Sequence, residues 1–160
     1  MEDNKELSSL LDPVCAIARQ AGEEILKILT AADRAAHQTI VNALATLTPD
    51  LPVLSEEACN IEYTVRSRWQ RYWLVDPLDG TKEFVKRNGE FTVNIALIDN
   101  RQPVLGVVYV PVTGVTYYGC RGSGAFKQLT DGDPAPIKVK AYEGGPVRVV
   151  ASRSHASPAL

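Results

Sequence analysis

Two short acidic stretches contain the residues best suited to chemistry in this sequence. The first is "WLVDPLDGTKEF", residues 73–84, in which Asp76 and Asp79 follow a short apolar run. A proline fixes one backbone angle and Asp-Gly favours a tight turn, so both carboxylates can face one point. Two carboxylates at such a short separation repel each other unless a cation lies between them. Oxygen ligands of this kind suit Mg²⁺, whose coordination is often completed by a substrate phosphate.

The second stretch is "PVLSEE", residues 52–57, an apolar segment that ends in Glu56 and Glu57. It would deliver carboxylates to a strand end, as the first stretch does at Asp76. Each stretch has a plain alternative. Asp-Pro-Leu-Asp-Gly is a good turn, and the second stretch could be a solvated acidic loop with Ser55 as a helix cap. Together, the two stretches predict one acidic metal site.

The residues after the second aspartate add a site for phosphate. Thr81 is predicted to cap a helix that begins at Lys82. The amides of Gly80 and Thr81 would then lie at the N-terminus of that helix, where N–H groups and the helix dipole favour anions. The stretch therefore predicts neighbouring sites for a cation and for the phosphate that completes its coordination.

The elements that must position these residues begin with two helical patterns. Asp12-Pro13 predicts a helix cap and first turn, and the second pattern stops at Pro49. The two apolar stripes comprise Val14, Ile17, Ala21, Ile25 and Ile28, then Ala36, Ile40, Leu44 and Leu47. Neither glycine nor proline interrupts the segment between them, so by pattern alone residues 13–47 could form a single, unusually long helix.

After Pro52 the pattern changes to that of β-strands separated by turns. Strands are predicted at "YWLV", with Asp76 at its end, then at "FTVNIALI", "VLGVVYV" and "VTYYG", and finally at "VRVVAS", residues 147–152. Connections this short favour antiparallel neighbours. The predicted fold class is α+β, with helices packed on an antiparallel sheet.

Composition and charge fit an ordinary globular protein. The 160 residues are 45% hydrophobic with a formal net charge of -2, so neither a nucleic-acid partner nor a membrane-spanning segment is predicted. The N-terminus lacks the apolar core of a signal peptide, which predicts a cytoplasmic protein and leaves peripheral membrane association open. Cys15, Cys59 and Cys120 form no CxxC pair, and His37 and His155 stand alone, so no disulfide framework, zinc site or histidine-based metal site is expected.

"LSEE" followed by "WLVDPLDGTKEF" resembles the Glu-Glu and Asp-Pro-Leu/Ile-Asp-Gly-Thr motifs of the Mg²⁺-dependent, lithium-sensitive inositol monophosphatase superfamily. "TKEF", the continuation "KRNGEFTVNIALIDNRQPVLGVVYVPV" and the late "SRSH" resemble its 3′(2′),5′-bisphosphate nucleotidase branch. The resemblance implies removal of the 3′-phosphate of adenosine 3′,5′-bisphosphate, giving AMP and phosphate, by water activated on two or three Mg²⁺ ions. It implies a small nucleotide as the partner and leaves the oligomeric state open.

The resemblance also implies a set of metal ligands. Glu56, Asp76 and the carbonyl of Leu78 would hold the first metal, and Asp76 and Asp79 would share the second. Glu57 is the weaker of the two glutamates as a ligand and would only help to shape the site.

Other matching residues would act on water and substrate. Thr81 resembles the threonine that orients the attacking water, and Asp33, in "TAAD", resembles the aspartate that hydrogen-bonds to that threonine. Ser152, Arg153 and His155 match the "SRSH" in which the histidine contacts nucleotide. An exposed helical Asp33, and a serine cap followed by a solvated histidine, are the plain alternatives.

The sequence departs from the family pattern at two places. Family members carry a hairpin-forming segment with Lys-x-Asp and Ser-Pro-x-Thr patterns just before "TAAD", whereas here Leu29 runs directly into Thr30. A missing loop is therefore expected at the junction that also lacked a helix breaker. The family's C-terminal α/β domain, whose Trp-Asp-x-Ala-Ala motif supplies a third metal-binding aspartate, would begin near Leu160.

The predicted domain is therefore residues 1–160, the N-terminal metal-binding part of the layered α/β/α/β/α sugar-phosphatase fold, with the C-terminal domain absent from the chain. Two alternatives to a nucleotidase remain open. One is an inositol monophosphatase or sugar bisphosphatase with the same metal machinery. The other is an inactive metal-binding fragment or regulatory module, which the missing third aspartate favours.

Overall fold

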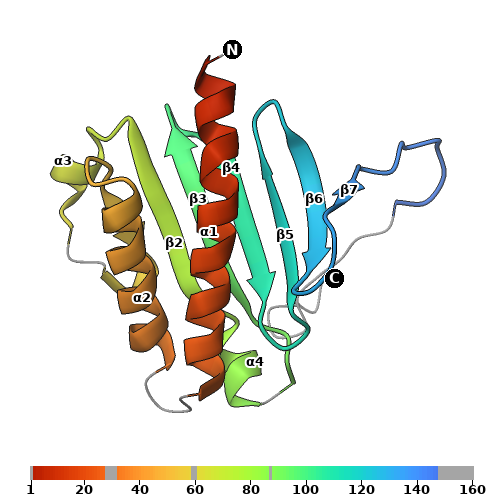
Figure 1. Ribbon diagram of the computed structural model, residues 1–160, viewed down its shortest axis with the longest axis horizontal. Helices are drawn as coiled ribbons and strands as arrows, with labels where there is room; N and C mark the ends of the chain where they lie inside the picture. The colour runs from red at the N-terminus through yellow and green to blue at the C-terminus, as the bar shows by residue number, and fades with distance from the viewer. Residues whose placement is uncertain (1, 28–31, 59–60, 87, 148–160) are drawn as a thin grey trace.

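Two long helices lie side by side across one face of a single β-sheet in the computed structural model of the protein (Figure 1). The structure describes residues 2–27, 32–58, 61–86 and 88–147. The helices are α1 (Glu2–Lys27) and α2 (Ala32–Leu47), and the sheet follows them along the chain. The predicted α+β class, with helices packed on a largely antiparallel sheet, is confirmed.

Helix α1 begins before the predicted cap at Asp12-Pro13, so that prediction is wrong. Pro13 lies inside the helix, where it cannot donate the usual hydrogen bond to the carbonyl of Ser9. Ser9 is exposed, so water can reach its carbonyl group. Upstream of the proline, Leu7 and Leu11 are only 1% and 6% exposed. Burial of these two leucines stabilises the additional turns and outweighs the helix-start signal at Pro13.

The sequence pattern was compatible with one helix over residues 13–47. The structure has two helices there, because α1 ends at Lys27 and α2 begins at Ala32. The missing loop expected between Leu29 and Thr30 falls outside the described residues. Both predicted apolar stripes lie in the core as far as the structure describes them. Buried in this way are Val14, Ile17, Ala21, Ile25, Ala36, Ile40 and Leu44, with Leu47 packed at the edge.

Within the described residues, the sheet has seven strands in chain order, and only the first pair of neighbours is parallel. The strands are β1 (Val53–Ser55), β2 (Arg71–Asp79), β3 (Thr92–Asp99), β4 (Gln102–Val110), β5 (Val115–Cys120), β6 (Gly124–Leu129) and β7 (Ala135–Ile137). Every pair from β2 onward is antiparallel, as the short connections predicted. Because the expected strand at 147–152 extends into residues 148–160, that prediction falls almost entirely outside the described part of the chain.

Three short helices complete the elements that the structure describes: η1 (Glu56–Ala58), α3 (Tyr63–Arg66) and α4 (Thr81–Val85). Helix α4 is anchored by Phe84, whose ring meets the ring of Phe91 edge-on at a centroid distance of 5.1 Å. Both rings are buried, so the segment that follows Asp79 is held against the start of β3.

The core fills the space between the helices and one face of the sheet. Trp73, 0% exposed on β2, donates its indole N–H to the hydroxyl of Thr48 at 2.8 Å, which ties the end of α2 to the sheet. Where α1 crosses β4, Gly22 is required, because a Cβ there would lie 2.5 Å from the ring of Tyr109. Cys15 and Cys120 are buried free thiols, and burial raises the pKa of Cys15 to about 11.

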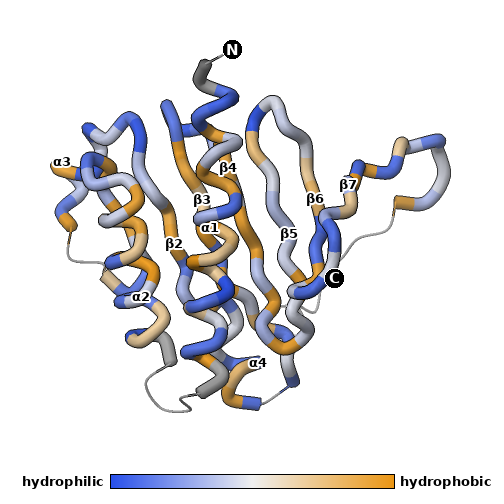
Figure 2. The backbone as a smooth tube through the Cα atoms, viewed as in Figure 1, coloured by the Kyte–Doolittle hydropathy of each residue, from blue (hydrophilic) through white to orange (hydrophobic). Residues whose placement is uncertain are grey.

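The opposite face of the sheet is covered by no long helix within the described residues (Figure 1). It leaves Leu74, Val108 and Tyr117 between 38% and 42% exposed. The most hydrophobic residues follow the central strands β3 and β4 (Figure 2). None of the described helices is long and apolar enough to cross a membrane.

Candidate functional site

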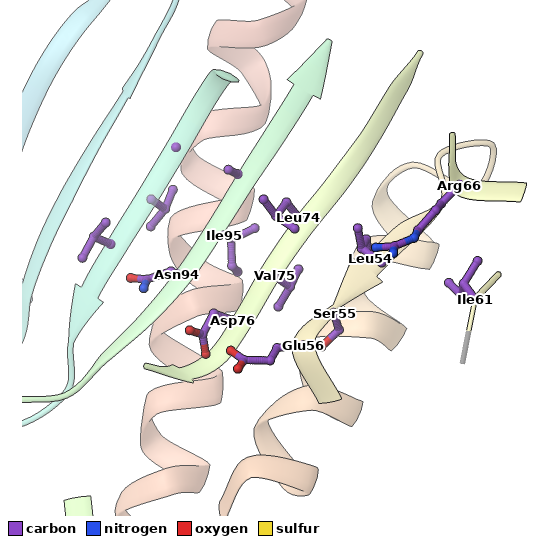
Figure 3. A pocket seen from close by; sticks show the side chains of 14 residues that line it. Leu54, Ser55, Glu56, Ile61, Arg66, Leu74, Val75, Asp76, Asn94 and Ile95 are labelled. Carbon is purple, nitrogen blue, oxygen red and sulfur yellow. The ribbon is translucent and has the colours of Figure 1, made fainter. Parts of the chain in front are cut away.

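The two acidic stretches meet where β1 and β2 run in parallel. Ser55 is opposite Val75 at the end of this ladder. The next residue on each strand, Glu56 after β1 and Asp76 on β2, therefore lies at the same end of the β1–β2 pair. The carboxylates of Glu56 and Asp76 point toward each other (Figure 3) and form a side-chain hydrogen bond. The parallel pairing of β1 with β2 therefore brings Glu56 and Asp76 together, as the two stretches predicted.

A β-bulge explains how two aspartates three residues apart can face the same side. In a regular strand, side chains alternate, so residues three apart point to opposite faces. Here Asp76 pairs with Asn94 while Asp79 pairs with Thr92, which places three steps of β2 opposite two steps of β3. The extra residue resets the alternation and brings Asp79 to the face that carries Asp76 and Asn94. The sequence prediction that the strand ends at Asp76 is wrong, because β2 continues through the bulge to Asp79.

The turn after the bulge is held by local hydrogen bonds. The Leu78 N–H donates to Oδ1 of Asp76 at 3.2 Å, and the Thr81 hydroxyl donates to the Leu78 carbonyl at 3.4 Å. The predicted capping role of Thr81 is wrong: Gly80 is the N-cap of α4, Thr81 is its first residue, and no side-chain hydrogen bond caps the helix. The Thr81 hydroxyl turns back to the Leu78 carbonyl instead, which brings together two groups predicted to serve the site.

Gly80 is the residue that lets the chain reverse at this point. Its φ of +97° lies in the left-handed region, which disfavours residues with a Cβ. A Cβ at this position would also lie 3.0 Å from the carbonyl oxygen of Glu90. The glycine is therefore needed both for its conformation and for its close approach to the residues just before β3.

One pocket of about 280 Å³ gathers most of the predicted site residues. It is lined by Glu56, Glu57, Asp76, Leu78, Asp79, Gly80 and Thr81, together with Lys82 and Glu83. A larger, mainly apolar pocket of about 560 Å³ adjoins it on the open face of the sheet and shares Glu56 and Asp76 with it. Figure 3 shows this second pocket, with the two carboxylates at one end and Leu54 and Leu74 further along.

The electrostatics of the pocket favour a cation. Burial, followed by the charges of Glu56 and Asp79, raises the pKa of Asp76 from 3.8 to about 7. The hydrogen bond with Glu56 acts in the same direction, whereas the Leu78 N–H lowers the pKa. A carboxyl group with a pKa raised by its neighbours marks a concentration of negative charge that a bound cation would relieve.

The donor set consists of carboxylate oxygens and one backbone carbonyl, the ligands that Mg²⁺ prefers. In the described part of the chain, no three histidine, cysteine or acidic side chains are yet close enough to enclose an ion. Glu56 and Asp76 are already in contact, and Asp79 is near enough for its charge to act on Asp76. The residues present fit a divalent oxygen-ligated ion, provided that the side chains close around it.

Some site residues were not singled out by the sequence. Asn94, opposite Asp76, donates its amide N–H to Oδ2 of Asp79 at 3.0 Å. His37 is hydrogen-bonded through Nδ1 to the hydroxyl of Ser55 at 2.8 Å, which links α2 to the residue before Glu56. The sequence carried no signal for Asn94, because it alternates with Thr92 and Ala96 on one face of the strand as an ordinary polar residue would.

Other predicted residues lie outside the described part of the chain, wholly or in their side chains. Asp33 lies in the first turn of α2, but the placement of its side chain falls outside the described residues. Ser152, Arg153 and His155 also fall outside them. The roles of Asp33, Ser152 and His155 therefore stay predictions. The contact of the Gly80 and Thr81 amides with a substrate phosphate stays a prediction as well.

Comparison with known proteins identifies relatives over nearly the whole chain. The model of the inositol monophosphatase family matches residues 6–158. The 3′(2′),5′-bisphosphate nucleotidase CysQ of Escherichia coli strain K12 is 51% identical, with 94% of this chain and 66% of that protein aligned. The chain therefore spans just under two thirds of the length of this curated relative.

Solved structures of inositol monophosphatase family proteins also match most of this chain. The crystal structure of CysQ from Bacteroides thetaiotaomicron superposes with a TM-score of 0.73 at 41% identity, covering 91% of this chain and 64% of that one. An inositol monophosphatase from Anabaena gives a TM-score of 0.70 at 29% identity, covering 85% and 50%. The described fold corresponds to one portion of these longer chains.

The alignment with the Escherichia coli protein also indicates a length difference within the matched region. It runs over 168 positions but takes in 94% of the 160 residues here, which is about 150 residues. The difference between 168 and about 150 leaves about 18 positions of that relative without a counterpart. This agrees with the expectation of a missing loop, whose location at Leu29-Thr30 stays a prediction.

Proposed function

The chain belongs to the inositol monophosphatase family, and we propose that it is the metal-binding portion of a Mg²⁺-dependent 3′(2′),5′-bisphosphate nucleotidase. The proposed reaction removes the 3′-phosphate of adenosine 3′,5′-bisphosphate to give AMP and phosphate. The observation that carries the chemistry is the single pocket in which Glu56, Asp76, Asp79 and Thr81 meet. The choice of substrate rests on the 51% identity to a relative named for this reaction.

The proposed metal ligands are Glu56, Asp76, Asp79 and the carbonyl oxygen of Leu78. Two or three Mg²⁺ ions held there would activate a water molecule and offset negative charge on the phosphoryl oxygens. The raised pKa of Asp76 supports this assignment, because it reflects carboxylates held together in a partly buried position. Glu57 lines the same pocket and is proposed to shape it rather than to bind metal.

Thr81 is proposed to orient the attacking water. Its hydroxyl proton is directed to the Leu78 carbonyl, so the lone pairs of Oγ1 remain able to accept a hydrogen bond from water. The backbone amides of Gly80 and Thr81 are proposed to contact the substrate phosphate. In the assembled site, the Thr81 hydroxyl is proposed to turn from the Leu78 carbonyl and to donate its proton to the carboxylate of Asp33, in the first turn of α2. The lone pairs of Oγ1 stay available to water in either arrangement.

Two further parts of the proposal concern residues beyond the pocket. Ser152 and His155 are proposed to contact the nucleotide, on the basis of the "SRSH" resemblance. A C-terminal α/β domain is proposed to supply a third metal-binding aspartate. The coverage of only 66% of the Escherichia coli relative and the uncovered apolar face of the sheet support this domain proposal.

Two other functions remain as alternatives. Similarity to the Anabaena inositol monophosphatase, at 29% identity, favours a phosphatase of inositol or sugar phosphates. The other alternative is a metal-binding fragment or regulatory module without turnover, which Mg²⁺ binding without phosphate release would favour.

The test is Mg²⁺-dependent release of phosphate from adenosine 3′,5′-bisphosphate and from inositol 1-phosphate by the purified protein. Selective release from the nucleotide supports the proposal, and selective release from inositol 1-phosphate replaces it with the first alternative. Mg²⁺ binding without release from either substrate indicates the second alternative. An Asp79→Asn variant serves as the control for contaminating phosphatases, because it should lose activity without losing its fold.

A further inference from the structure

We propose that Asn94 is a positioning residue for the metal site, holding the carboxylate of Asp79 in the orientation that binds the ion. The inference rests on the proposed function, because it assumes that Asp79 is a metal ligand. It adds a residue that neither the motifs nor the family comparison singled out. Asn94 lies on β3, directly opposite Asp76 in the ladder.

The bulge in β2 places Asp79 within reach of Asn94. Because the extra residue brings Asp79 to the face that carries Asp76 and Asn94, the amide of Asn94 can cross the strand pair to Asp79. The amide nitrogen donates to Oδ2 of Asp79 at 3.0 Å. Asn94 therefore touches one proposed ligand while lying beside another.

The orientation of the Asn94 amide follows from the chemistry of its partner. An ionised carboxylate only accepts hydrogen bonds, so the NH₂ group of Asn94 must face Asp79 and the carbonyl oxygen must point elsewhere. The bond fixes the orientation of the Asp79 carboxylate through Oδ2 and leaves both lone pairs of Oδ1 for a cation. Hydrogen bonds of this kind orient metal ligands, and their loss typically weakens metal binding by about 10–100-fold.

The other end of the amide indicates that Asn94 is not there for stability. Its Oδ1 atom is buried and has no hydrogen-bond partner among the described residues. A buried acceptor without a partner destabilises a fold, and an apolar residue of the same shape removes that cost. Leucine at this position would therefore leave the metal-free fold equally or more stable. The hydrogen bond from the Asn94 nitrogen to the carboxylate of Asp79 therefore explains why asparagine occupies this position.

The experiment measures the melting temperature of the full chain as a function of Mg²⁺ concentration, with Mg²⁺ alone as the probe. Asn94→Leu is the test variant, and Asn94→Ala is a second variant that also lacks the donor but adds no bulk. Asn42→Leu is the matched control, because it removes an asparagine from an exposed hydrogen bond on α2, away from the pocket.

Both Asn94 variants should need about 10–100 times more Mg²⁺ than the wild type to reach half of the melting shift. In EDTA, Asn94→Leu should melt at or above the wild-type temperature, and Asn42→Leu should keep the wild-type response to Mg²⁺. An unchanged Mg²⁺ response in both Asn94 variants would overturn the inference and leave the proposed function standing. The same holds if both variants unfold or melt well below the wild type in EDTA, since Asn94 would then be structural. A wild type without any Mg²⁺ response would overturn the proposed function, and the inference with it.

Discussion

Asp76→Asn is expected to stabilise the metal-free protein at neutral pH and to have no such effect in acid. Burial, the charges of Glu56 and Asp79, and the hydrogen bond with Glu56 raise the pKa of Asp76 to about 7. Asparagine keeps an Oδ1 atom that can accept the hydrogen bond that the Leu78 N–H now donates at 3.2 Å. The substitution therefore removes the charge while preserving the turn.

The direction of the pH dependence follows from the sign of the shift. An acid whose pKa is higher in the folded state than in the unfolded state binds more protons when folded, so stability falls as pH rises between the two values. For Asp76 these values are about 7 in the folded protein and about 3.8 in the unfolded chain. The destabilisation is absent below pH 4, grows from pH 4 to 7 and is complete above pH 7.

The magnitude can be estimated from the same two values. A difference of about 3 in pKa corresponds to about 4 kcal/mol between the two protonation states. Because Asp76 is only partly buried, solvent screens its interactions, and we take about half, or about 2 kcal/mol. For a chain of this length, 2 kcal/mol corresponds to a difference of about 4–8 °C in melting temperature.

The assay is thermal unfolding in EDTA, followed by circular dichroism at intervals from pH 4 to 8, for the wild type and Asp76→Asn. The control is Asp131→Asn, which removes an exposed aspartate outside the pocket and should give no pH-dependent difference. Saturating Mg²⁺ should raise the melting temperature of the wild type more than that of Asp76→Asn, because the cation offsets the repulsion only where all the carboxylates remain. A difference between Asp76→Asn and wild type that stays constant, or shrinks, as pH rises would refute the reasoning.

Two further predictions concern the residues that support the site and the core. Gly80→Ala should lower the melting temperature and weaken the Mg²⁺ response, because the new Cβ would lie 3.0 Å from the Glu90 carbonyl oxygen at a φ of +97°. The left-handed backbone alone costs about 1–3 kcal/mol, and Gly144→Ala, at a φ of +89° with nothing within 4 Å, measures that part separately; equal losses would show that the contact is unimportant. Thr48→Val should cost about 1–3 kcal/mol in urea unfolding, because the buried Trp73 indole N–H loses its acceptor. Thr46→Val, which removes an exposed hydroxyl bonded to a carbonyl of its own helix, should be nearly neutral, and equal costs would contradict the explanation.

The parts of the fold that follow from local pattern were predictable. The apolar stripes of α1 and α2 have helical spacing, and β3 alternates regularly, so each element can be recognised without its neighbours. Asp76 and Asp79 were recognised because proline, glycine and two acids within five residues are a strong local signal. Glu56 could be assigned to the same site only because "PVLSEE" and "WLVDPLDGTKEF" both end an apolar segment in acidic residues.

The parts that depend on packing could not be read from the sequence. Asp12-Pro13 looks like a helix start, but burial of Leu7 and Leu11 extends the helix through it. The choice of Gly80 over Thr81 as the cap is decided by a backbone angle, which sequence pattern does not specify. Asn94 acquires a role only because a bulge on the neighbouring strand turns Asp79 toward it.

The parallel pairing of β1 with β2 has a consequence for folding kinetics. From β2 to β7 each strand pairs with the next along the chain, and hairpins such as Cys120 with Gly124 close only a few residues. The β1 pair joins residues 20 apart, such as Ser55 and Val75, whereas the nearest pair between β2 and β3 is Asp79 with Thr92, 13 apart. Pairing of β1 therefore closes the longest minimum loop in the sheet, and non-local contacts of this kind tend to form later.

A transition state that contains the hairpins but lacks the β1 pair would hold Asp76 and Asp79 before Glu56 joins them. Mg²⁺ is then expected to slow unfolding while leaving the folding rate nearly unchanged, because its site is incomplete in the transition state. Stopped-flow refolding and unfolding would distinguish this pattern from one in which Mg²⁺ speeds refolding, which would mean that the site forms early. The metal would protect the finished fold without helping the chain to reach it.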